Sequence, residues 1–395
     1  MGKCYIVDGI RTPIGKFGGA LKDFKATELG SILVKKIVDN NNLTNKNVDG
    51  VIIGNVLQAG LGQNPARQCA LKGGLNCETN CFTINKVCGS GLKAIDIAFK
   101  EIVSGNGNVF IAGGIESMSN ASYISEGARW GYKFGHGKFS DEILINGLWC
   151  PYNNLHMGEI AEELASKYGI SRDIQDDFSF NSHRKAISAI ENGGFLKEII
   201  PIELKNKDKN GLSVFNTDEN PRKDTTIEKL SELKPVFKKN GTITAGNSSG
   251  INDGAAIMLL VSETGIKELN LKPLAEVISV SEVGVQPKLF GIAPVNAIKK
   301  ALKIAKLNIN DIDIFEINEA FAAQILCVLK DLNLKDDIVN VNGGAIALGH
   351  PIGASGARIV VTLLHEMKKS NKKFGLASIC VGSGEGMAIV LRRIN

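Results

Sequence analysis

Short apolar runs alternate with amphipathic stretches along almost the whole of the 395-residue chain, and this alternation restricts the possible folds more than any other feature. The apolar runs predict strands at residues 51–56, 109–113, 314–317, 338–341, 376–381 and 387–391. The amphipathic stretches predict helices at residues 29–39, 92–103, 160–168, 177–192, 295–305 and 354–369. Strands that alternate with helices indicate an α/β fold whose sheets are covered by helices on both faces.

Two segments of the chain follow the same local pattern. Gly89-Ser90-Gly91 opens one predicted helix and Ala354-Ser355-Gly356 opens another. In each segment a predicted strand follows about 20 residues later, which favours two similar βαβ-type halves over coincidence.

The length also predicts more than one domain, because single hydrophobic cores stop growing well below 395 residues. The middle of the chain holds both tryptophans, many polar residues and weak strand patterning, as expected for an inserted loop domain that covers the core. The expected division is a first half at 1–119, the inserted loop domain at 120–242, a return to the first half at 243–268 and a second half at 269–395.

The composition is that of an ordinary globular protein, with 44% hydrophobic residues, 22% charged residues and a net charge of +5. Lysine-rich clusters at residues 205–209, 234–239 and 368–373 lie in polar segments, which favours solvated loops and helix ends over a nucleic-acid surface. A few of these cations are still suited to attracting a small polyanion such as a nucleotide phosphate.

The eight cysteines include no CxxC pair and the chain has only five histidines, so neither a zinc site nor another metal site is expected. The N-terminus lacks the apolar core of a signal peptide and runs directly into a predicted strand. No apolar run reaches the length of a membrane span. These features predict reduced thiols in a cytoplasmic protein.

Cys88 is the strongest candidate for a nucleophile. It precedes Gly89-Ser90-Gly91 at a predicted strand-to-helix turn, where the free N–H groups of a helix start favour the thiolate. A buried structural cysteine is the alternative interpretation.

His350 lies between glycines in Gly349-His350-Pro351, directly before a predicted helix. An imidazole in this setting is suited to accept a thiol proton near neutral pH, although a turn or core histidine explains the same pattern.

Two further motifs place polar groups at the ends of predicted strands. Cys380 ends one strand and enters a glycine-rich turn through Gly382, whose backbone N–H groups are suited to bind an oxyanion; a plain hairpin turn is the alternative. Asn318 follows another strand in Glu316-Ile317-Asn318-Glu319, where it either caps the next helix or holds a water or substrate oxygen.

Together, these motifs resemble the thiolase family, and the resemblance runs across essentially the whole chain. Their order along the chain is Cys, then Asn-Glu-Ala-Phe, then Gly-His-Pro-x-Gly-x-Ser-Gly, then Cys-x-Gly-x-Gly-x-Gly. Blocks at residues 11–19, 54–68, 112–119 and 244–256 agree with the resemblance. The block at 58–68 is most similar to the short-chain, biosynthetic branch of the family, the acetyl-CoA C-acetyltransferases. The resemblance implies a thiolase-like fold of two halves in α-β-α-β-α layers with an inserted loop domain.

The resemblance also implies a mechanism. Cys88 would be acylated by acetyl-CoA, His350 would act as the base, and the backbone N–H groups of Cys88 and Gly382 would bind the oxyanion. Cys380 would deprotonate a second acetyl-CoA, and Asn318 would hold a water at the enolate. The product would be acetoacetyl-CoA, with CoA released and no metal or redox cofactor. Cys88 and Cys380 would lie close enough together for an oxidant to join them in a disulfide.

The family's CoA contacts map onto residues near the predicted loop domain. They are Leu148, His156, Met157, Arg222, Phe237, Ala245, Ser249 and Phe321. The family forms homo-oligomers, often dimers of dimers, and the resemblance gives residues 130–139 as a candidate for the contacts between dimers.

The sequence departs from the family pattern at a few positions. Ser383 replaces a glycine of the last motif, Glu385 adds a charge there, and Ile160 stands where threonine is usual. Phe290 stands near a position that is often methionine beside the acyl pocket, so it is expected to narrow the pocket and favour acetyl groups.

Three alternatives follow from these motifs. A 3-ketoacyl-CoA thiolase of fatty-acid β-oxidation with broad chain length is the first. A ketoacyl-carrier-protein synthase is disfavoured because Cys380 stands where those enzymes have a second histidine. A non-catalytic thiolase-like binding protein would lack one of the four chemical residues, and none is missing.

Overall fold

The computed structural model describes residues 2–43, 47–205 and 212–394. Among these residues, ten strands form one mixed sheet in the order β14-β15-β16-β13-β1-β12-β5-β3-β4, with β2 paired to β12. The N-terminal strands are β1 (Cys4–Arg11), β2 (Gly15–Lys16), β3 (Gly50–Gly54), β4 (Asn80–Ile84), β5 (Val109–Ser117) and β12 (Asn252–Ser262). The C-terminal strands are β13 (Ala275–Gly284), β14 (Ile314–Ile317), β15 (Phe374–Val381) and β16 (Glu385–Arg393).

The sheet consists of two halves that meet at a short seam. Strands β1 and β13 are joined through only two residue pairs, Tyr5 with Glu276 and Ile6 with Ala275. On each side of this seam the outermost strands pair in parallel, namely β5, β3 and β4 in one half and β14 with β15 in the other. The strands nearer to the seam pair antiparallel.

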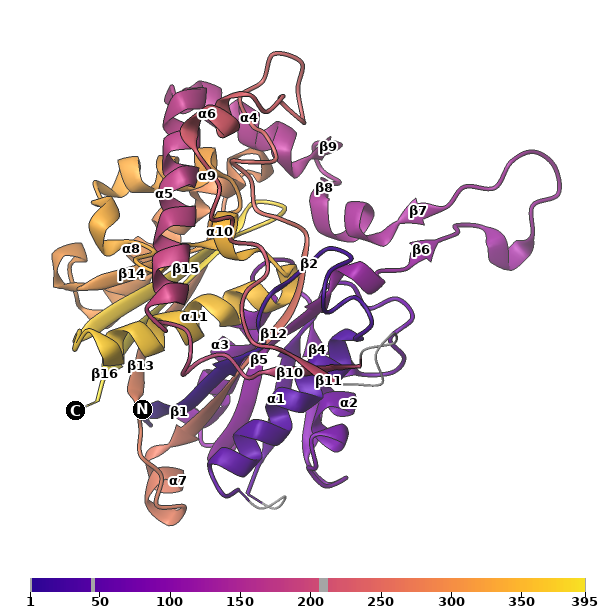
Figure 1. The fold of residues 1–395 in the computed structure, drawn as a ribbon. Coiled ribbons are helices and arrows are strands. Elements are labelled where there is room, and N and C mark those ends of the chain that lie inside the picture. Colours follow the sequence, from indigo (N-terminus) through magenta and orange to yellow (C-terminus); the bar gives the residue numbers. More distant parts are fainter. Residues whose placement is uncertain (1, 44–46, 206–211, 395) are drawn as a thin grey trace.

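Helices form three layers around the two half-sheets, as Figure 1 shows. Helices α1 (Ala26–Asn40) and α2 (Pro65–Lys72) pack on the outer face of the N-terminal half. Helices α8 (Ala293–Ala305) and α9 (Ala322–Leu332) pack on the outer face of the C-terminal half. Helices α3 (Ser90–Val103) and α11 (Ile352–Lys369) share the central core with inner residues of both half-sheets. The predicted α-β-α-β-α arrangement is confirmed.

Glycines allow the two central helices to come together. A Cβ on Gly91 of α3 would lie 2.7 Å from the backbone nitrogen of Ala357, and one on Gly356 of α11 would lie 2.6 Å from the nitrogen of Leu92. Real Cβ contacts are not this short, so no larger residue fits at either position without moving a helix. Because Cys88 and His350 immediately precede these helices, the close packing also brings their two loops together.

A long segment between β5 and β12 adds further elements around this core. It contains α4 (Met157–Tyr168), α5 (Arg172–Glu191), α6 (Ile227–Ser231), the π-helical turn Ile143–Leu148 and the small strands β8 (Trp149–Cys150), β9 (Leu155–His156), β10 (Ile202–Lys205) and β11 (Leu212–Phe215). An arm that carries β6 (Tyr123–Ile124) and β7 (Ser140–Asp141) projects from the body in Figure 1. The boundary residues 119, 242 and 268 of the expected domain division stay predictions.

The strand expected at 338–341 is wrong. Asp336–Ile338 form a 3-10 turn, and Val339 makes only an isolated bridge to Phe315. Asn340 has a left-handed backbone with φ 45°, and its side chain binds both backbone groups of Ile317. The segment therefore closes the end of β14 instead of adding a strand.

The other expected elements are present, with helices that begin two to five residues earlier than predicted. The long strands β12 and β13 were not among the predicted strands. Residues 206–209 of the first lysine cluster lie outside the described residues. In the part of the chain that the structure describes, no helix combines the length and the apolar character needed to cross a bilayer.

Candidate active site

A cavity of about 300 Å³ brings together side chains that are far apart in the sequence. Four of the five predicted catalytic residues line it, namely Cys88, His350, Cys380 and Gly382. They come from the starts of the two central helices and from the turn between β15 and β16. The cavity therefore lies where the two halves of the molecule meet.

Cys88 lies one residue before Gly89, the N-cap of α3. The preceding residue, Val87, has φ 45°, a conformation that a β-branched residue rarely adopts and that occurs at functional turns. Burial raises the pKa of the Cys88 thiol to about 11, and the backbone N–H of Gly382 partly opposes this by stabilising the thiolate. The resting thiol is therefore protonated and already faces a hydrogen-bond donor.

His350 is held on the loop before α11 by contacts on two sides. Its backbone N–H donates to Asn252 Oδ1 at 3.0 Å, and its ring nitrogen Nδ1 lies 2.5 Å from Ser355 Oγ. Burial and then the nearby charge of Arg358 lower the pKa of His350 to about 3. The imidazole is therefore neutral at physiological pH and able to accept a proton.

Cys380 is a buried thiol one residue before the end of β15. Burial raises its pKa, and the proximity of Cys88 raises it further, so the two sulfur atoms influence each other. All eight cysteines are free thiols. Among the described residues, no group of three or more His, Cys, Asp or Glu side chains is placed to hold a metal ion.

Asn318 lies on the loop between β14 and α9 and does not itself line the cavity. It is fully buried, and neither its amide oxygen nor its amide nitrogen has a hydrogen-bond partner in the protein. It does not cap α9, because the N-cap position of that helix is Phe321. A buried amide without partners is suited to bind a water or a substrate oxygen.

The turn from Val381 to Glu385 is a tight connection between the antiparallel strands β15 and β16. The sequence left open a hairpin turn or an oxyanion site here, and the turn is a hairpin whose Gly382 N–H also points at Cys88. Ser383 has φ 71°, so the departure from glycine places a side chain on a left-handed backbone. Glu385 forms an ion pair with Lys86 at 2.9 Å, which joins this turn to the loop that carries Cys88.

Most of the predicted CoA contacts line the rest of the same cavity. They are Leu148, His156, Met157, Phe237, Ser249 and Phe321, joined by Phe290. The π-helical turn that ends at Leu148 and the start of α4 form part of the wall, so the long segment between β5 and β12 covers the predicted catalytic residues. The wall also includes Met118, Val236, Ser248 and Ile352, which the sequence did not single out.

Three rings contact one another in this wall. His156 stacks on Phe237 with ring centroids 4.7 Å apart, and Phe237 meets Phe321 edge-on at 6.0 Å. A Cβ on Gly158 would lie 2.4 Å from the Phe237 ring, so the stack depends on a glycine in the first turn of α4. Burial lowers the pKa of His156, whose Nδ1 accepts a hydrogen bond from the backbone N–H of Gly158.

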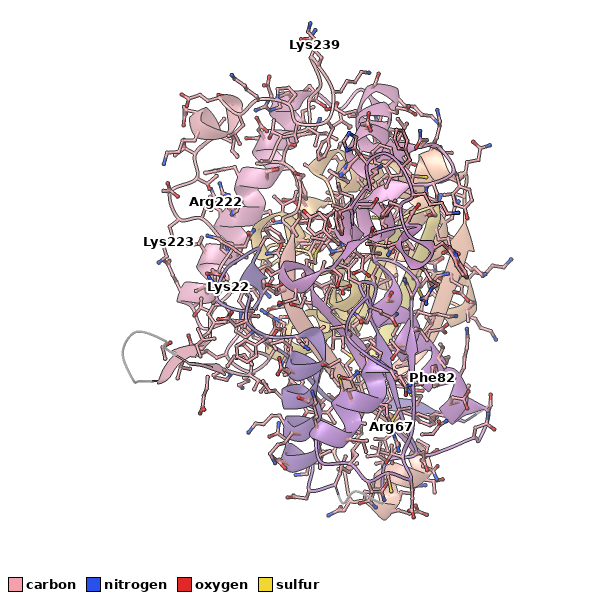
Figure 2. The ribbon with its side chains drawn as sticks, turned by 90° about the vertical axis from the view of Figure 1, so that its right-hand side faces the viewer. Lys22, Arg67, Phe82, Arg222, Lys223 and Lys239 are labelled. Atoms are coloured by element: carbon pink, nitrogen blue, oxygen red, sulfur yellow. The ribbon has the colours of Figure 1, made fainter. Side chains whose placement is uncertain are left out.

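Arg222 and Ala245 do not line the cavity of Cys88. They line a narrow neighbouring space of about 60 Å³ that shares Ser248 and Gly250 with it. On the face of the molecule shown in Figure 2, Arg222 lies beside Lys223.

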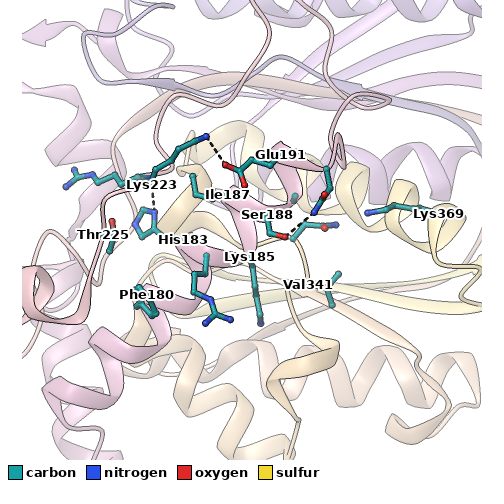
Figure 3. A pocket seen from close by; sticks show the side chains of 15 residues that line it. Phe180, His183, Lys185, Ile187, Ser188, Glu191, Lys223, Thr225, Val341 and Lys369 are labelled. Atoms are coloured by element: carbon teal, nitrogen blue, oxygen red, sulfur yellow. Dashed lines mark hydrogen bonds and ion pairs between the residues drawn. The ribbon is translucent and has the colours of Figure 1, made fainter.

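A third space of about 510 Å³ lies along α5 and is lined by several cations, which Figure 3 shows in part. Lys223 is paired there with Glu191 at 2.8 Å, and Lys185 is paired with Asp336 at 3.0 Å. Arg222 lines this space as well, so it connects the basic surface of α5 with the path toward Cys88.

Comparisons with known proteins agree with this fold. The thiolase N-terminal domain matches residues 4–264, and the thiolase C-terminal domain matches residues 271–393. Probable acetyl-CoA acyltransferases of Staphylococcus aureus, from strains COL and N315, are 50% identical over 393 residues and cover 100% of both chains. The crystal structure of the Bacillus anthracis acetyl-CoA acetyltransferase superposes with a TM-score of 0.97 at 43% identity, covering 100% of this chain and 99% of that one. The chain belongs to the thiolase family.

Proposed function

We propose that the protein catalyses the reversible condensation of two acetyl-CoA molecules to acetoacetyl-CoA and CoA through an acetyl-Cys88 intermediate. The observation that carries this proposal is the cavity in which two thiols, Cys88 and Cys380, face one imidazole, that of His350. One thiol is needed to hold an acyl group and another group is needed to remove a proton from carbon. The names of the Staphylococcus aureus and Bacillus anthracis relatives support acetyl-CoA as the substrate.

In the first half-reaction, Cys88 sulfur attacks the carbonyl carbon of acetyl-CoA while His350 accepts the thiol proton. The pKa values of about 11 for Cys88 and about 3 for His350 mean that the neutral pair predominates at rest, so proton transfer accompanies the attack. The backbone N–H of Gly382 is placed to bind the oxyanion. The C–S bond to CoA breaks, the departing thiolate takes the proton back from His350, and CoA leaves.

In the second half-reaction, a second acetyl-CoA occupies the same cavity. His350 first accepts the proton of the Cys380 thiol. The Cys380 thiolate then acts as a base and removes a proton from the α-carbon of this acetyl-CoA, and the enolate oxygen is stabilised by the protonated His350 and by a water held on Asn318. The carbanion attacks the acetyl carbon on Cys88, a new C–C bond forms, and the Cys88 sulfur leaves as a thiolate that regains a proton from His350. The reverse direction is thiolysis of acetoacetyl-CoA.

No electrons pass to an external acceptor in either half-reaction, so the proposal includes no resident metal or redox cofactor. The substrates are CoA thioesters, whose pantetheine arm fits the apolar wall around the His156–Phe237 stack. Arg222, in the neighbouring space, is proposed to meet the anionic nucleotide end of CoA.

Phe290 supports a preference for acetyl groups. Its buried ring packs in one cluster with Cys380, Met157 and Phe321 and lines the cavity. A ring at this position leaves less room for the alkyl chain of a longer acyl group. The alternative, a 3-ketoacyl-CoA thiolase of β-oxidation, requires that room.

The decisive experiment compares thiolysis of acetoacetyl-CoA with thiolysis of a long-chain 3-ketoacyl-CoA. The proposal predicts at least about a tenfold preference in kcat/KM for acetoacetyl-CoA, corresponding to about 1.4 kcal/mol of differential transition-state binding. Phe290→Ala should reduce this preference for acetoacetyl-CoA. Phe237→Ala, which removes the stacked ring, should weaken the binding of both substrates to a similar extent. Equal rates on both substrates in the wild type would favour the β-oxidation alternative.

The nucleophile is tested separately. Cys88→Ala should abolish the acetylated-enzyme signal in mass spectrometry after exposure to acetyl-CoA, whereas Cys380→Ala should retain that signal and lose condensation. Retention of condensation by Cys88→Ala would remove the covalent intermediate from the proposal.

We further propose that the protein acts in the cytoplasm as a homo-oligomer. Two surfaces support the second point: β4 is an edge strand of the sheet with Phe82 exposed, and the arm carries exposed aromatic residues including Trp130 and Phe134. Phe82 is visible on the face drawn in Figure 2. Exposed apolar groups of this size mark contact surfaces.

A further inference from the structure

Among the residues that the structure describes, the ring of His350 has one hydrogen-bonded side-chain partner, the hydroxyl of Ser355. Ser355 lies in the first turn of α11 and is 1% exposed. Its Oγ lies 2.5 Å from His350 Nδ1 and donates to the carbonyl oxygen of Pro351 at 2.8 Å. The hydroxyl therefore connects the imidazole to the backbone of the same loop.

We propose that Ser355 is a positioning residue that keeps the His350 proton on Nδ1 and thereby presents the Nε2 lone pair to the Cys88 thiol. The inference deepens the proposed function, on which it rests for the role of His350 as a base. It assigns a part in the reaction to a residue that does not line the cavity of Cys88.

The number of protons on the hydroxyl and on the imidazole decides which ring nitrogen is protonated. A serine hydroxyl has one proton and two lone pairs, and a carbonyl oxygen can only accept. When the hydroxyl donates to Pro351, the short contact to Nδ1 is a hydrogen bond only if Nδ1 carries a proton and donates to Oγ. A neutral imidazole has a single N–H, so Nε2 is then unprotonated.

The opposite arrangement, in which the hydroxyl donates to Nδ1, suits the reaction less well. The carbonyl oxygen of Pro351 already accepts hydrogen bonds from the backbone N–H groups of Ala354 and Ser355, at 2.9 Å each. It therefore does not need the Ser355 hydroxyl as a donor, and the hydroxyl could donate to Nδ1 without leaving this carbonyl unpaired. However, His350 must carry protons on both nitrogens once it has accepted the thiol proton. A hydroxyl that donates to Nδ1 would have to rotate during the reaction, whereas one that accepts from Nδ1 serves both states without rearrangement.

The surroundings make this acceptor important. His350 is 6% exposed, and Arg358 lies on the same helix as Ser355, so the imidazolium formed during the reaction is short of stabilising partners. A hydroxyl oxygen that already accepts from Nδ1 can strengthen its bond as the positive charge develops. Loss of this acceptor should therefore slow proton transfer from Cys88 more than it weakens substrate binding.

The first test measures the reactivity of Cys88 without any CoA substrate, so it does not depend on the acyl chemistry. Iodoacetamide labelling is followed at each cysteine by mass spectrometry, with exposed Cys77 as the internal reference. Ser355→Ala should slow labelling of Cys88 about tenfold at neutral pH and leave Cys77 unchanged. Ser279→Ala is the matched control, because Ser279 is also 1% exposed and also donates to a backbone carbonyl, that of Ala301.

Steady-state kinetics extend the test to turnover. Ser355→Ala is expected to lower kcat about 10- to 100-fold, part of the contribution of a positioned general base, with KM changed by less than about threefold. Ser279→Ala should match the wild type. Labelling of Cys88 in Ser355→Ala within twofold of the wild type would overturn the proposal, even if turnover were lower.

The second test is a direct observation on the wild-type protein. Nitrogen-15 NMR of labelled histidines distinguishes an imidazole protonated on Nδ1 from one protonated on Nε2, and His350→Asn identifies the signal among the five histidines. The proposal predicts a proton on Nδ1 in the wild type and a mixture of both forms in Ser355→Ala. A proton on Nε2 in the wild type would overturn it whether or not the Ser355 variant folds. If the proposed function alone is wrong, the protein will not transfer acetyl groups, but the labelling of Cys88 and the protonation of His350 will still be as predicted.

Discussion

Val87 and Ser383, which lie beside the proposed nucleophile Cys88 and the proposed oxyanion donor Gly382, adopt left-handed backbone conformations that their side chains disfavour. Val87 precedes Cys88 with φ 45°, and Ser383 follows the proposed oxyanion donor Gly382 with φ 71°. For residues with a Cβ, this conformation costs roughly 1–2 kcal/mol. Both turns are held by neighbours, since Lys86 and Glu385 form an ion pair between them at 2.9 Å.

Replacing Ser383 by glycine should raise the free energy of unfolding by about 1 kcal/mol, because glycine adopts this φ without strain. Urea denaturation measures the change. Ser104→Gly is the control, because Ser104 has φ −86° and gains nothing from glycine. A Ser383→Gly protein no more stable than the wild type would show that the serine side chain compensates for its backbone.

His183 predicts a pH dependence of stability. Burial and then the charge of Arg222 lower its pKa to about 4, while the unfolded chain has a value near 6.5. A group whose pKa is lowered by folding stabilises the protein fully above the unfolded pKa and loses that contribution as the pH falls toward the folded value. Between pH 7 and pH 5 this loss is about 2 kcal/mol.

His183→Asn should remove this pH dependence and keep an acceptor for the backbone N–H of Arg222, which lies 3.2 Å from His183 Nδ1. The quantity to measure is the difference in unfolding free energy between wild type and variant at the two pH values, because other titrating groups cancel in it. An unchanged difference from pH 7 to pH 5 would contradict the prediction.

At the scale of elements, the contact between α3 and α11 controls the geometry of the site. Gly356→Ala places a Cβ 2.6 Å from the backbone nitrogen of Leu92, so one helix must shift. We expect a loss of about 1–3 kcal/mol in stability, typical of overpacking, together with a lower kcat because Cys88 and His350 move apart. Gly284→Ala is the control, since a Cβ there meets nothing within 4 Å. If Gly356→Ala kept the kcat of the wild type, the packing of α3 on α11 would not determine catalysis, which would contradict the prediction.

The same elements show what the sequence can predict. Apolar patterning identified the helices around the core, and glycine-flanked Cys88, His350 and Cys380 identified the cavity, because these signals are local. The run at 338–341 looked like a strand, but Asn340 closes the end of β14 through side-chain hydrogen bonds that patterning does not contain. Ser355 was not singled out as a site residue, because its partner His350 becomes significant only through the 2.5 Å contact in the folded chain.

At the scale of the whole molecule, the arm between β6 and β7 presents apolar side chains to solvent. Tyr123, Trp130 and Phe134 are 67%, 84% and 103% exposed. The arm projects away from the core in Figure 1, and these side chains are mostly exposed in the single chain. They are suited to contact a second copy.

Replacing Trp130 and Phe134 together by serine should reduce the size of the oligomer without changing the melting temperature of the remaining unit. Light scattering coupled to size-exclusion chromatography measures this. Leu196→Ser, at a side chain 75% exposed outside the arm, is the control. An unchanged molar mass in the double variant would place the oligomer contacts elsewhere, with the edge strand β4 as the next candidate.

The central layer also has a consequence for how the protein is made. Helix α3 packs its apolar face against α11, which begins about 260 residues later in the chain. At translation speeds of about 5–20 residues per second, α3 leaves the ribosome roughly 10–50 s before its partner exists. For that interval β3 and β5 can cover one face of α3, but the face that meets α11 lacks its partner, and we expect chaperones to bind the nascent chain at this exposed apolar face.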